Sequence, residues 1–231
     1  ARAAGFDNVS FDLMFGLPRQ TLAEWDRTLE AAFALGVPHL SMYGLTVEEG
    51  TPFWARRERG RLTLPGEGLQ ASMFARAMER AAAAGYVRYE ISNHARPGYA
   101  CRHNQIYWRN EEYFGFGAGA AGYRGGVRSV NERRPSRYIE RVRSEGGPVF
   151  AESERLEARA AMGETAMLGL RLAEGLDLEA FAARFGVRAE EVFAAEMARV
   201  EAKGWAVREG GRLRLTERGV MLASEAMAEF V

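Results

Sequence analysis

The stretch Val9-Ser-Phe-Asp-Leu-Met-Phe15, followed by Gly16-Leu-Pro18 and Thr21-Leu-Ala-Glu24, decides the fold class of this chain. Apolar side chains occupy every second position of the first segment, and Ser10, Asp12 and Met14 fall on the opposite face. Such alternation predicts a β-strand with one buried face. The Thr-X-X-Glu pattern is a capping box, so a helix is expected to begin directly after the turn. A strand followed by a helix indicates an α/β fold.

The residues downstream repeat this order of strand and helix. A second strand is expected at about Leu40–Leu45, a short basic helix near Phe53–Arg59, a long helix at about Glu67–Ala84 and a third strand at Tyr86–Ser92. Strands joined by helices predict a parallel sheet with right-handed crossovers. Three strands leave exposed edges, and the chain does not begin with Met. We therefore expect the second half of a (β/α) barrel whose first half lies upstream of residue 1.

The sequence changes character in its second half. A short strand at Val127–Val130, a helix at Pro135–Arg143 and a linker at Gly146-Gly147-Pro148 are expected, which predicts domains at residues 1–147 and 148–231. The second domain is expected to contain three helices, a hairpin and a last helix, which is a winged-helix-like order. These elements are expected at Glu154–Leu172, Leu178–Phe185, Ala189–Ala202, Trp205–Leu215 and after Thr216.

The composition excludes several classes of protein. The 231 residues carry no net charge and 47% of them are hydrophobic, so we expect a folded core and no global field that attracts nucleic acid or anionic membranes. No apolar run reaches about 18 residues, the length that a membrane-spanning helix needs, and we expect no signal peptide. A single cysteine excludes an internal disulfide and indicates a reducing, cytoplasmic location.

The stretch Cys101-Arg-His-Asn-Gln-Ile-Tyr-Trp108 is the strongest candidate for a ligand site. The imidazole of His103 can bind haem iron or another transition metal, and its second nitrogen needs an orienting partner. Tyr107 and Trp108 could supply a hydrogen bond and a flat aromatic wall for a macrocycle. The alternative is ordinary packing of a histidine among aromatic residues, and the spacing leaves both open. Cys101 is expected to be an inert or accessory thiol, because an iron–sulfur cluster needs three or four thiolates.

Three further features are candidates for ligand contacts. Asp12 is costly to bury without a partner and lies where a barrel gathers ligand groups, with a salt bridge or a helix cap as the alternative. Gly117-Ala-Gly-Ala-Ala-Gly122 matches a dinucleotide-binding pattern without its strand and helix, so we expect a loop pressed against a flat ligand or other backbone. Arginines outnumber acidic residues ten to five between Arg96 and Glu145, which suits an anionic ligand or a solvated face.

The winged-helix-like order also raises a DNA-binding regulator as an alternative function. Its third helix would then be the recognition helix. That helix has more acidic than basic residues, namely Glu190, Glu191, Glu196 and Glu201 against Arg199 and Lys203. Because phosphate contacts dominate the affinity for DNA, such a helix would repel it. We therefore expect no nucleic-acid partner.

Seven motifs together indicate a family. They are Ser10–Thr21, Leu40–Tyr43, Glu49–Phe53, Gly85–Asn93, Arg96–Gly98, His103–Trp108 and Gly115–Ala120. This set resembles the HemW-like haem chaperones, which are radical S-adenosylmethionine (SAM) proteins akin to oxygen-independent coproporphyrinogen III oxidase. The resemblance runs over essentially the whole chain. The His-Asn-X-X-Tyr-Trp pattern separates HemW-like proteins from true coproporphyrinogen dehydrogenases.

The resemblance implies a fold and a set of ligands. The fold would be the second half of a partial radical SAM barrel, followed by the winged-helix-like C-terminal domain of this family. Asp12 matches the aspartate that contacts SAM, and Thr46 falls near the backbone that approaches SAM. His103 would be an axial ligand of haem iron, flanked by Tyr107 and Trp108. The ligands of the [4Fe–4S] cluster, a Cys-X-X-X-Cys-X-X-Cys motif, would lie upstream of residue 1.

The resemblance also implies a function for the whole protein. It would be a haem chaperone that hands haem to acceptor proteins, and the resemblance allows a peripheral membrane contact and a homodimer. No catalytic residue is assigned in this chain, which alone should neither hold the cluster nor cleave SAM. The alternative is a coproporphyrinogen III dehydrogenase, in which a 5′-deoxyadenosyl radical abstracts hydrogen from a propionate side chain. Ala121-Gly122 replaces the His-Ser pair usual in the family, so we expect weaker or differently arranged haem binding.

Overall fold

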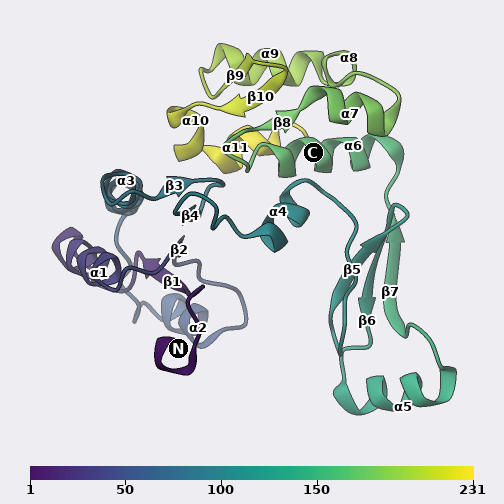
Figure 1. Ribbon diagram of the computed structural model, residues 1–231, viewed down its shortest axis with the longest axis horizontal. Helices are drawn as coiled ribbons and strands as arrows, with labels where there is room; N and C mark the ends of the chain where they lie inside the picture. Colours follow the sequence, from purple (N-terminus) through teal and green to yellow (C-terminus); the bar gives the residue numbers. More distant parts are fainter. The chain divides into compact units, whose positions relative to one another are not determined.

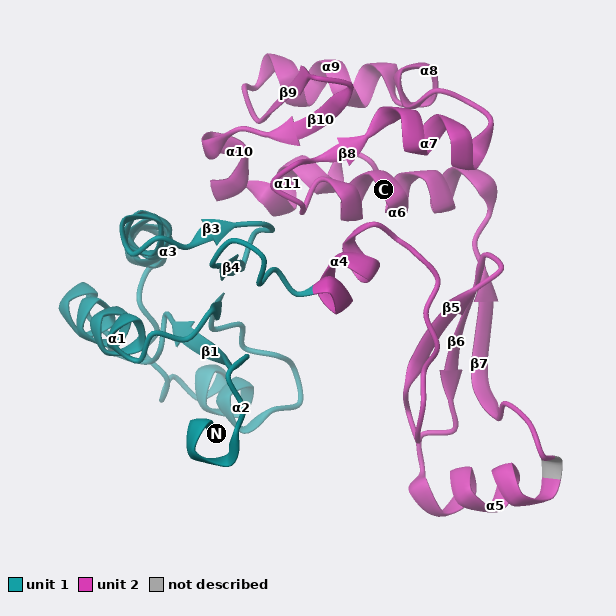
Figure 2. Cartoon of the chain, in the orientation of Figure 1, with its two compact units in different colours: residues 1–101 teal, residues 102–231 magenta. Residues whose placement is uncertain are grey.

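The computed structural model describes residues 1–144 and 146–231, and of residue 145 it gives only the helix that ends there. The chain forms two compact units, residues 1–101 and residues 102–231 (Figure 1, Figure 2). The domain boundary expected after residue 147 lies inside the second unit, between a helix and a strand. No helix in the described ranges has the length and apolar character needed to cross a bilayer.

The first unit is built on a four-stranded sheet in the order β1-β2-β4-β3. Its elements are η1 (Arg2–Ala4), β1 (Ser10–Phe15), α1 (Leu22–Ala34), β2 (His39–Gly44), α2 (Pro52–Glu58), α3 (Glu67–Ala83), β3 (Val87–Arg88) and β4 (Asn93–Ala95). β1 and β2 pair in parallel, with Asp12 opposite Ser41. The expected capping box is present at the start of α1, where the Thr21 hydroxyl accepts from the Glu24 N–H. The expected parallel strand–helix–strand unit is therefore confirmed.

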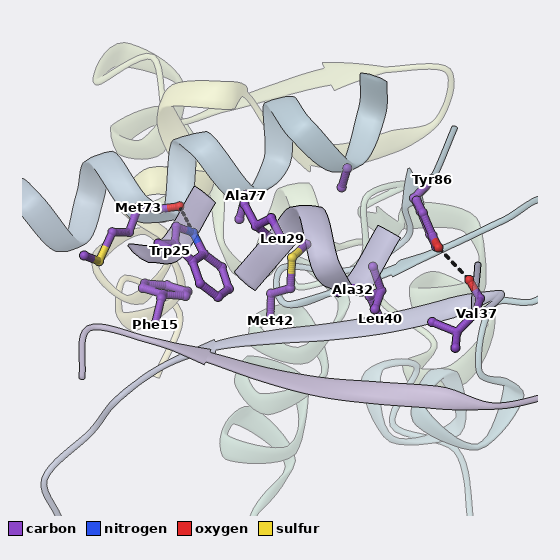
Figure 3. Close-up of a cluster of buried hydrophobic side chains, with 11 residues drawn as sticks. Phe15, Trp25, Leu29, Ala32, Val37, Leu40, Met42, Met73, Ala77 and Tyr86 are labelled. Atoms are coloured by element: carbon purple, nitrogen blue, oxygen red, sulfur yellow. Dashed lines mark hydrogen bonds between the residues drawn. The ribbon is translucent and has the colours of Figure 1, made fainter. Parts of the chain in front are cut away.

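One apolar core joins this sheet to α1 and α3 (Figure 3). Phe15 of β1 packs against the fully buried Trp25 of α1, with 5.6 Å between the ring centres. The indole N–H of Trp25 donates to the carbonyl oxygen of Met73 in α3 at 2.9 Å. The hydroxyl of Tyr86 donates to the Val37 carbonyl at 2.6 Å. The apolar residues that alternation predicts on one face of β1 lie in or against this core, and Ser10, Asp12 and Met14 lie exposed on the other face.

The single strand expected at Tyr86–Ser92 is wrong. The chain instead forms a hairpin of β3 and β4, and β4 runs antiparallel to both β3 and β2. The sheet is therefore mixed rather than parallel. Glu90 explains the turn, because its buried carboxylate accepts from the N–H of Ser92 at 2.8 Å and from the side chain of Asn93. Side-chain hydrogen bonds of this kind reverse a chain without changing its apolar pattern.

The second unit begins with α4 (Arg102–Trp108) and an antiparallel sheet in the order β5-β6-β7. Its strands are β5 (Ala121–Arg124), β6 (Val127–Asn131) and β7 (Phe150–Arg155), and α5 (Pro135–Glu145) lies between β6 and β7 in the sequence. β6 and α5 agree with the expected elements, whereas β5 and β7 are additional. The helix expected from Glu154 begins only at Ala158. All residues of β7 are exposed, so this strand carries no pattern of burial in its sequence.

The remainder of the second unit is winged-helix-like, and we call residues 158–231 the C-terminal domain. It contains α6 (Ala158–Gly169), β8 (Leu176–Asp177), α7 (Leu178–Phe185), α8 (Ala189–Val192), α9 (Ala194–Ala202), β9 (Ala206–Glu209), β10 (Arg212–Leu215), α10 (Glu217–Met221) and α11 (Ala223–Ala228). α7 and the β9–β10 hairpin confirm the expected elements, and β8 extends the hairpin to three strands. The helix expected at Ala189–Ala202 is interrupted at Phe193, whose ring is buried beside Phe181 and Phe230. The helix breaks at the residue whose ring is buried, so we attribute the break to the packing of Phe193.

Candidate functional site

His103 and Tyr107 lie together on one face of α4, as a spacing of four residues requires. His103 is exposed and Tyr107 is half-buried. A hydrogen bond of 2.9 Å joins the His103 Nε2 atom to the Tyr107 hydroxyl, and the two rings meet edge to face at 4.9 Å. The ring of Tyr113 packs against Tyr107 in the same manner at 4.5 Å. His103 is thus the solvent-facing member of a short row of aromatic rings.

Trp108 lies on another side of α4. Five residues separate it from His103, which places the two side chains about 140° apart around the helix axis. The Arg171 guanidinium carbon lies 4.2 Å from the centre of the Trp108 ring, and α4 packs against α6. The indole Nε1 atom is buried and has no hydrogen-bond partner among the described residues. The structure therefore brings Tyr107 to His103 but not Trp108, which supports the helix from the side of the C-terminal domain.

Asn110, a residue outside all of the sequence motifs, fixes the end of α4. Its φ of 52° is a backbone conformation that asparagine tolerates well after a helix. Its side-chain amide donates to the Thr165 hydroxyl at 3.0 Å, and its backbone carbonyl oxygen accepts from the Arg184 guanidinium at 2.7 Å. A seven-residue helix is not stable by itself, so contacts with the C-terminal domain set the position of His103. An asparagine directly beyond a short helix is the signal that could have identified this residue.

The glycine-rich run turns tightly against its own backbone. A side-chain carbon at Gly115 would overlap the carbonyl oxygen of Ala121, and one at Gly122 would lie 3.1 Å from the Gly115 nitrogen. The Asn131 side chain donates to the carbonyl oxygens of Gly115 and Gly117 at 3.1 and 2.9 Å. The run leads into β5 rather than into a helix. Of the two explanations that the sequence leaves open, close approach of other backbone accounts for Gly115 and Gly122.

The face of the first sheet opposite the core carries Asp12 and a row of polar side chains. The Ser10 hydroxyl lies 2.7 Å from His39 Nδ1, and His39 Nε2 lies 2.9 Å from the Tyr89 hydroxyl. Burial lowers the pKa of His39, against the attraction of Asp12 and Glu90. Asp12 itself is exposed and makes no hydrogen bond or ion pair with the described residues. An unpaired carboxylate of this kind can accept hydrogen bonds from the hydroxyl or amino groups of a ligand.

Thr46 lies beyond the end of β2, the strand that pairs with β1. It is exposed, and with Phe53 it lines a shallow cleft of about 310 Å³. Asp12 therefore lies on β1, and Thr46 lies beyond the C-terminal end of the neighbouring parallel strand. The described residues contain no group of three side chains that could hold a metal ion, and Cys101 is a free thiol. A single thiolate does not fit an iron–sulfur cluster.

His94 gives the first unit a stability that depends on pH. It is 2% exposed in β4, and its pKa is lowered to about 4, mainly by burial and then by the nearby Arg88 and His39. In the unfolded chain an imidazole titrates near 6.5. Its contribution to stability is therefore complete above about pH 6.5, and it is lost as the pH falls toward 4, because only the unfolded chain gains the proton.

We expect the free energy of unfolding of the first unit to fall by about 2 kcal/mol between pH 7 and pH 5 on account of His94. Urea denaturation at the two pH values measures this change. A His94→Leu variant lacks the titrating ring, so its loss over the same interval should be smaller by that amount. His39, whose pKa is also lowered, continues to contribute in both proteins. Equal losses in the two proteins would show that His94 does not cause the pH dependence.

Comparisons with known proteins relate this chain to HemW and HemN proteins. Residues 156–222 match the family model described as the HemN C-terminal domain. A Bacillus subtilis (strain 168) protein named "Heme chaperone HemW" is 37% identical over 231 residues, which cover 100% of this chain and 61% of that protein. An Escherichia coli (strain K12) protein of the same name is 32% identical over 237 residues, which cover 100% of this chain and 60% of that protein. The chain thus spans about three fifths of the length of these relatives.

One solved structure resembles the chain closely in fold. It is described as coproporphyrinogen III oxidase (HemN) from Escherichia coli, a radical SAM enzyme, and the TM-score is 0.76 at 19% identity. The match covers 99% of this chain and 56% of that chain. The expected α/β fold, part of a radical SAM barrel followed by a winged-helix-like domain, is therefore confirmed.

Proposed function

Because this chain is a homologue of the HemW proteins along all of its 231 residues, we propose that it is part of a haem chaperone, which binds haem and passes it to acceptor proteins. The observation that carries the proposal is the exposed imidazole of His103, which is hydrogen-bonded to Tyr107. The end of their helix is hydrogen-bonded to the C-terminal domain through Asn110. A solvent-facing imidazole suits a cargo that must both arrive and leave.

His103 would bind haem iron through one of its two ring nitrogens. Nε2 is already hydrogen-bonded to the Tyr107 hydroxyl. Iron at Nδ1 would leave Tyr107 as the orienting partner of the ring, whereas iron at Nε2 would break this hydrogen bond. The orientation of the ring depends on Tyr107 in either case. Trp108 supports the opposite side of the helix, so we assign it a positioning role in haem binding.

SAM and a [4Fe–4S] cluster enter the proposal through homology. Asp12 fits a SAM contact as an exposed, unpaired carboxylate on β1, and Thr46, beyond the neighbouring strand, is the second residue that we propose for SAM. The cluster does not fit this chain, because Cys101 is its single thiol. The cluster ligands would belong to the part of the whole protein that corresponds to the remaining length of the relatives. We derive no chemical step from either group.

A turnover assay of the whole protein with coproporphyrinogen separates the chaperone from the dehydrogenase. Sustained formation of protoporphyrinogen would contradict the chaperone assignment. We further propose that the protein works in the cytoplasm, because its single cysteine suits a reducing compartment. Contact with a membrane surface and a homodimer stay predictions of the family resemblance.

A His103→Ala variant of the whole protein should bind haem at least about tenfold more weakly, which corresponds to about 1.4 kcal/mol. Its absorption spectrum should also lose the signature of histidine ligation, because no imidazole reaches the iron. Titration of haem followed by absorbance measures both. Arg102→Ala, the exposed neighbour on the same helix, is the matched control and should retain affinity and spectrum. An unchanged spectrum in His103→Ala would remove His103 from the proposal.

A further inference from the structure

A second aromatic surface lies near the loop that follows α4. Phe114 and Phe116 are 62% and 85% exposed, and their rings stack at 5.9 Å with 25° between their planes. They border a cavity of about 310 Å³ between the loop, α5 and the segment that leads into β7. Exposed apolar patches of this kind mark binding surfaces in folded proteins, and the volume lies within the range of small-molecule sites. The cavity is distinct from the surface of α4 that carries His103.

Helix α5 forms a second wall of this cavity. The Tyr138 hydroxyl accepts a hydrogen bond from the Gly117 N–H at 3.3 Å and so ties the helix to the loop. Val142 lines the cavity beside Tyr138, and Ile139 lies one turn before Val142 on the same side of the helix. Val142 and Ile139 are 38% and 49% exposed. Phe150 is also exposed on the third side, so the walls are apolar while the mouth is open to solvent.

One cationic side chain, that of Arg124, lies at the border of the cavity. Arg124 lines it and places its guanidinium carbon 4.4 Å from the centre of the Phe114 ring. Arg124 is exposed and forms no ion pair with a described carboxylate. Guanidinium groups without carboxylate partners can bind an anionic ligand bidentately. Apolar aromatic walls beside a guanidinium group without a carboxylate partner fit a flat, apolar ring that carries a carboxylate at its edge.

We propose that this cavity, bounded by Phe114, Phe116, Tyr138 and Val142, holds an edge of the porphyrin ring of haem while Arg124 binds a propionate. The proposal builds on the proposed function and adds a site to it. Tyr113 connects the two regions, because it lines the cavity and its ring packs on Tyr107, the partner of His103. The ring-binding surface and the iron ligand would then contribute separately to the affinity.

Metal-free protoporphyrin IX tests this surface, because it has the ring and the propionates but no iron for His103 to ligate. Fluorescence titration of the whole protein measures its affinity. A Phe114→Ser/Phe116→Ser double variant should bind the porphyrin at least about tenfold more weakly, since hot-spot aromatic residues carry much of a binding energy. Phe6→Ser, which alters a phenylalanine that is 64% exposed in the first unit, should bind as the unaltered protein does. Circular dichroism checks that each variant is folded.

The outcomes separate this inference from the proposed function. Loss of porphyrin binding in the double variant, with binding retained in His103→Ala, supports the cavity. Unchanged porphyrin binding in the double variant overturns it, and so does a variant that loses only its binding to phosphatidylglycerol vesicles, which would identify a lipid surface. If His103→Ala leaves the spectrum of bound haem unchanged while the double variant still loses the porphyrin, the ligand assignment fails and the cavity stands.

Discussion

Replacing Trp25 by alanine is expected to lower the free energy of unfolding of the first unit by about 4 kcal/mol. Deletion of a buried aromatic side chain typically costs about 3–5 kcal/mol, because apolar contacts are lost and a cavity remains. Trp25 is 0% exposed, and its ring packs on Phe15, which also stacks with Phe74. The hydrogen bond from its indole to Met73 links α1 to α3. Its loss therefore affects both helices that cover the sheet.

Urea denaturation followed by circular dichroism measures this change without requiring the tryptophan as a reporter. Trp25→Phe is the matched variant, because it keeps a buried ring and removes the indole N–H. It should cost less than Trp25→Ala, and the difference between the two reports the packing contribution. If both variants lost the same stability, the hydrogen bond to Met73 would dominate, and the volume of the ring would not be the cause of the loss.

A Gly219→Ala substitution should destabilise the C-terminal domain by about 3 kcal/mol, at the upper end of the cost of overpacking a filled site. An added side-chain carbon at Gly219 would overlap the carbonyl oxygen of Trp205 and lie 2.7 Å from its carbonyl carbon. The obstacle is backbone and not the end of a flexible side chain. The same carbonyl accepts from the Thr216 N–H at 2.9 Å, so it cannot move without loss of the bond that holds α10 to the β9–β10 hairpin.

Thermal unfolding of the whole chain measures the effect. Gly68→Ala is the control, because Gly68 also lies in a helix and has no atom within 4 Å of the position of an added carbon. There the substitution should be neutral or stabilise α3 by up to about 1 kcal/mol, since alanine favours helices. A Gly219→Ala protein as stable as the unaltered one would mean that α10 can shift away from Trp205.

The sequence predicts the elements whose local interactions follow a recognised pattern. The capping box of Thr21 and Glu24 and the alternation of β1 involve neighbours in the chain, and both occur as expected. β7 and the β3–β4 hairpin depend on interactions that leave no period in the sequence. β7 is held by pairing with β6, and the hairpin turns because Glu90 binds nearby donors.

The candidate site follows the same division. The contact of His103 with Tyr107 follows from helical spacing alone. The separation of Trp108 from His103 follows from the same geometry, but its role in holding α4 depends on Arg171 and α6. The bonds of Asn110 reach residues 55 and 74 positions further along the chain. No local pattern reports partners at such separations.

The anchoring of α4 has a thermodynamic consequence. Because Trp108 and Asn110 dock a helix too short to persist alone, a cargo that needs the ordered helix is linked to that docking equilibrium. Linkage is reciprocal. A bound ligand stabilises the docked state of α4 by the same factor by which docking raises the affinity for that ligand. In the proposed haem chaperone, a change that weakened the contacts of α6 with α4 would therefore weaken haem binding without any contact with the imidazole.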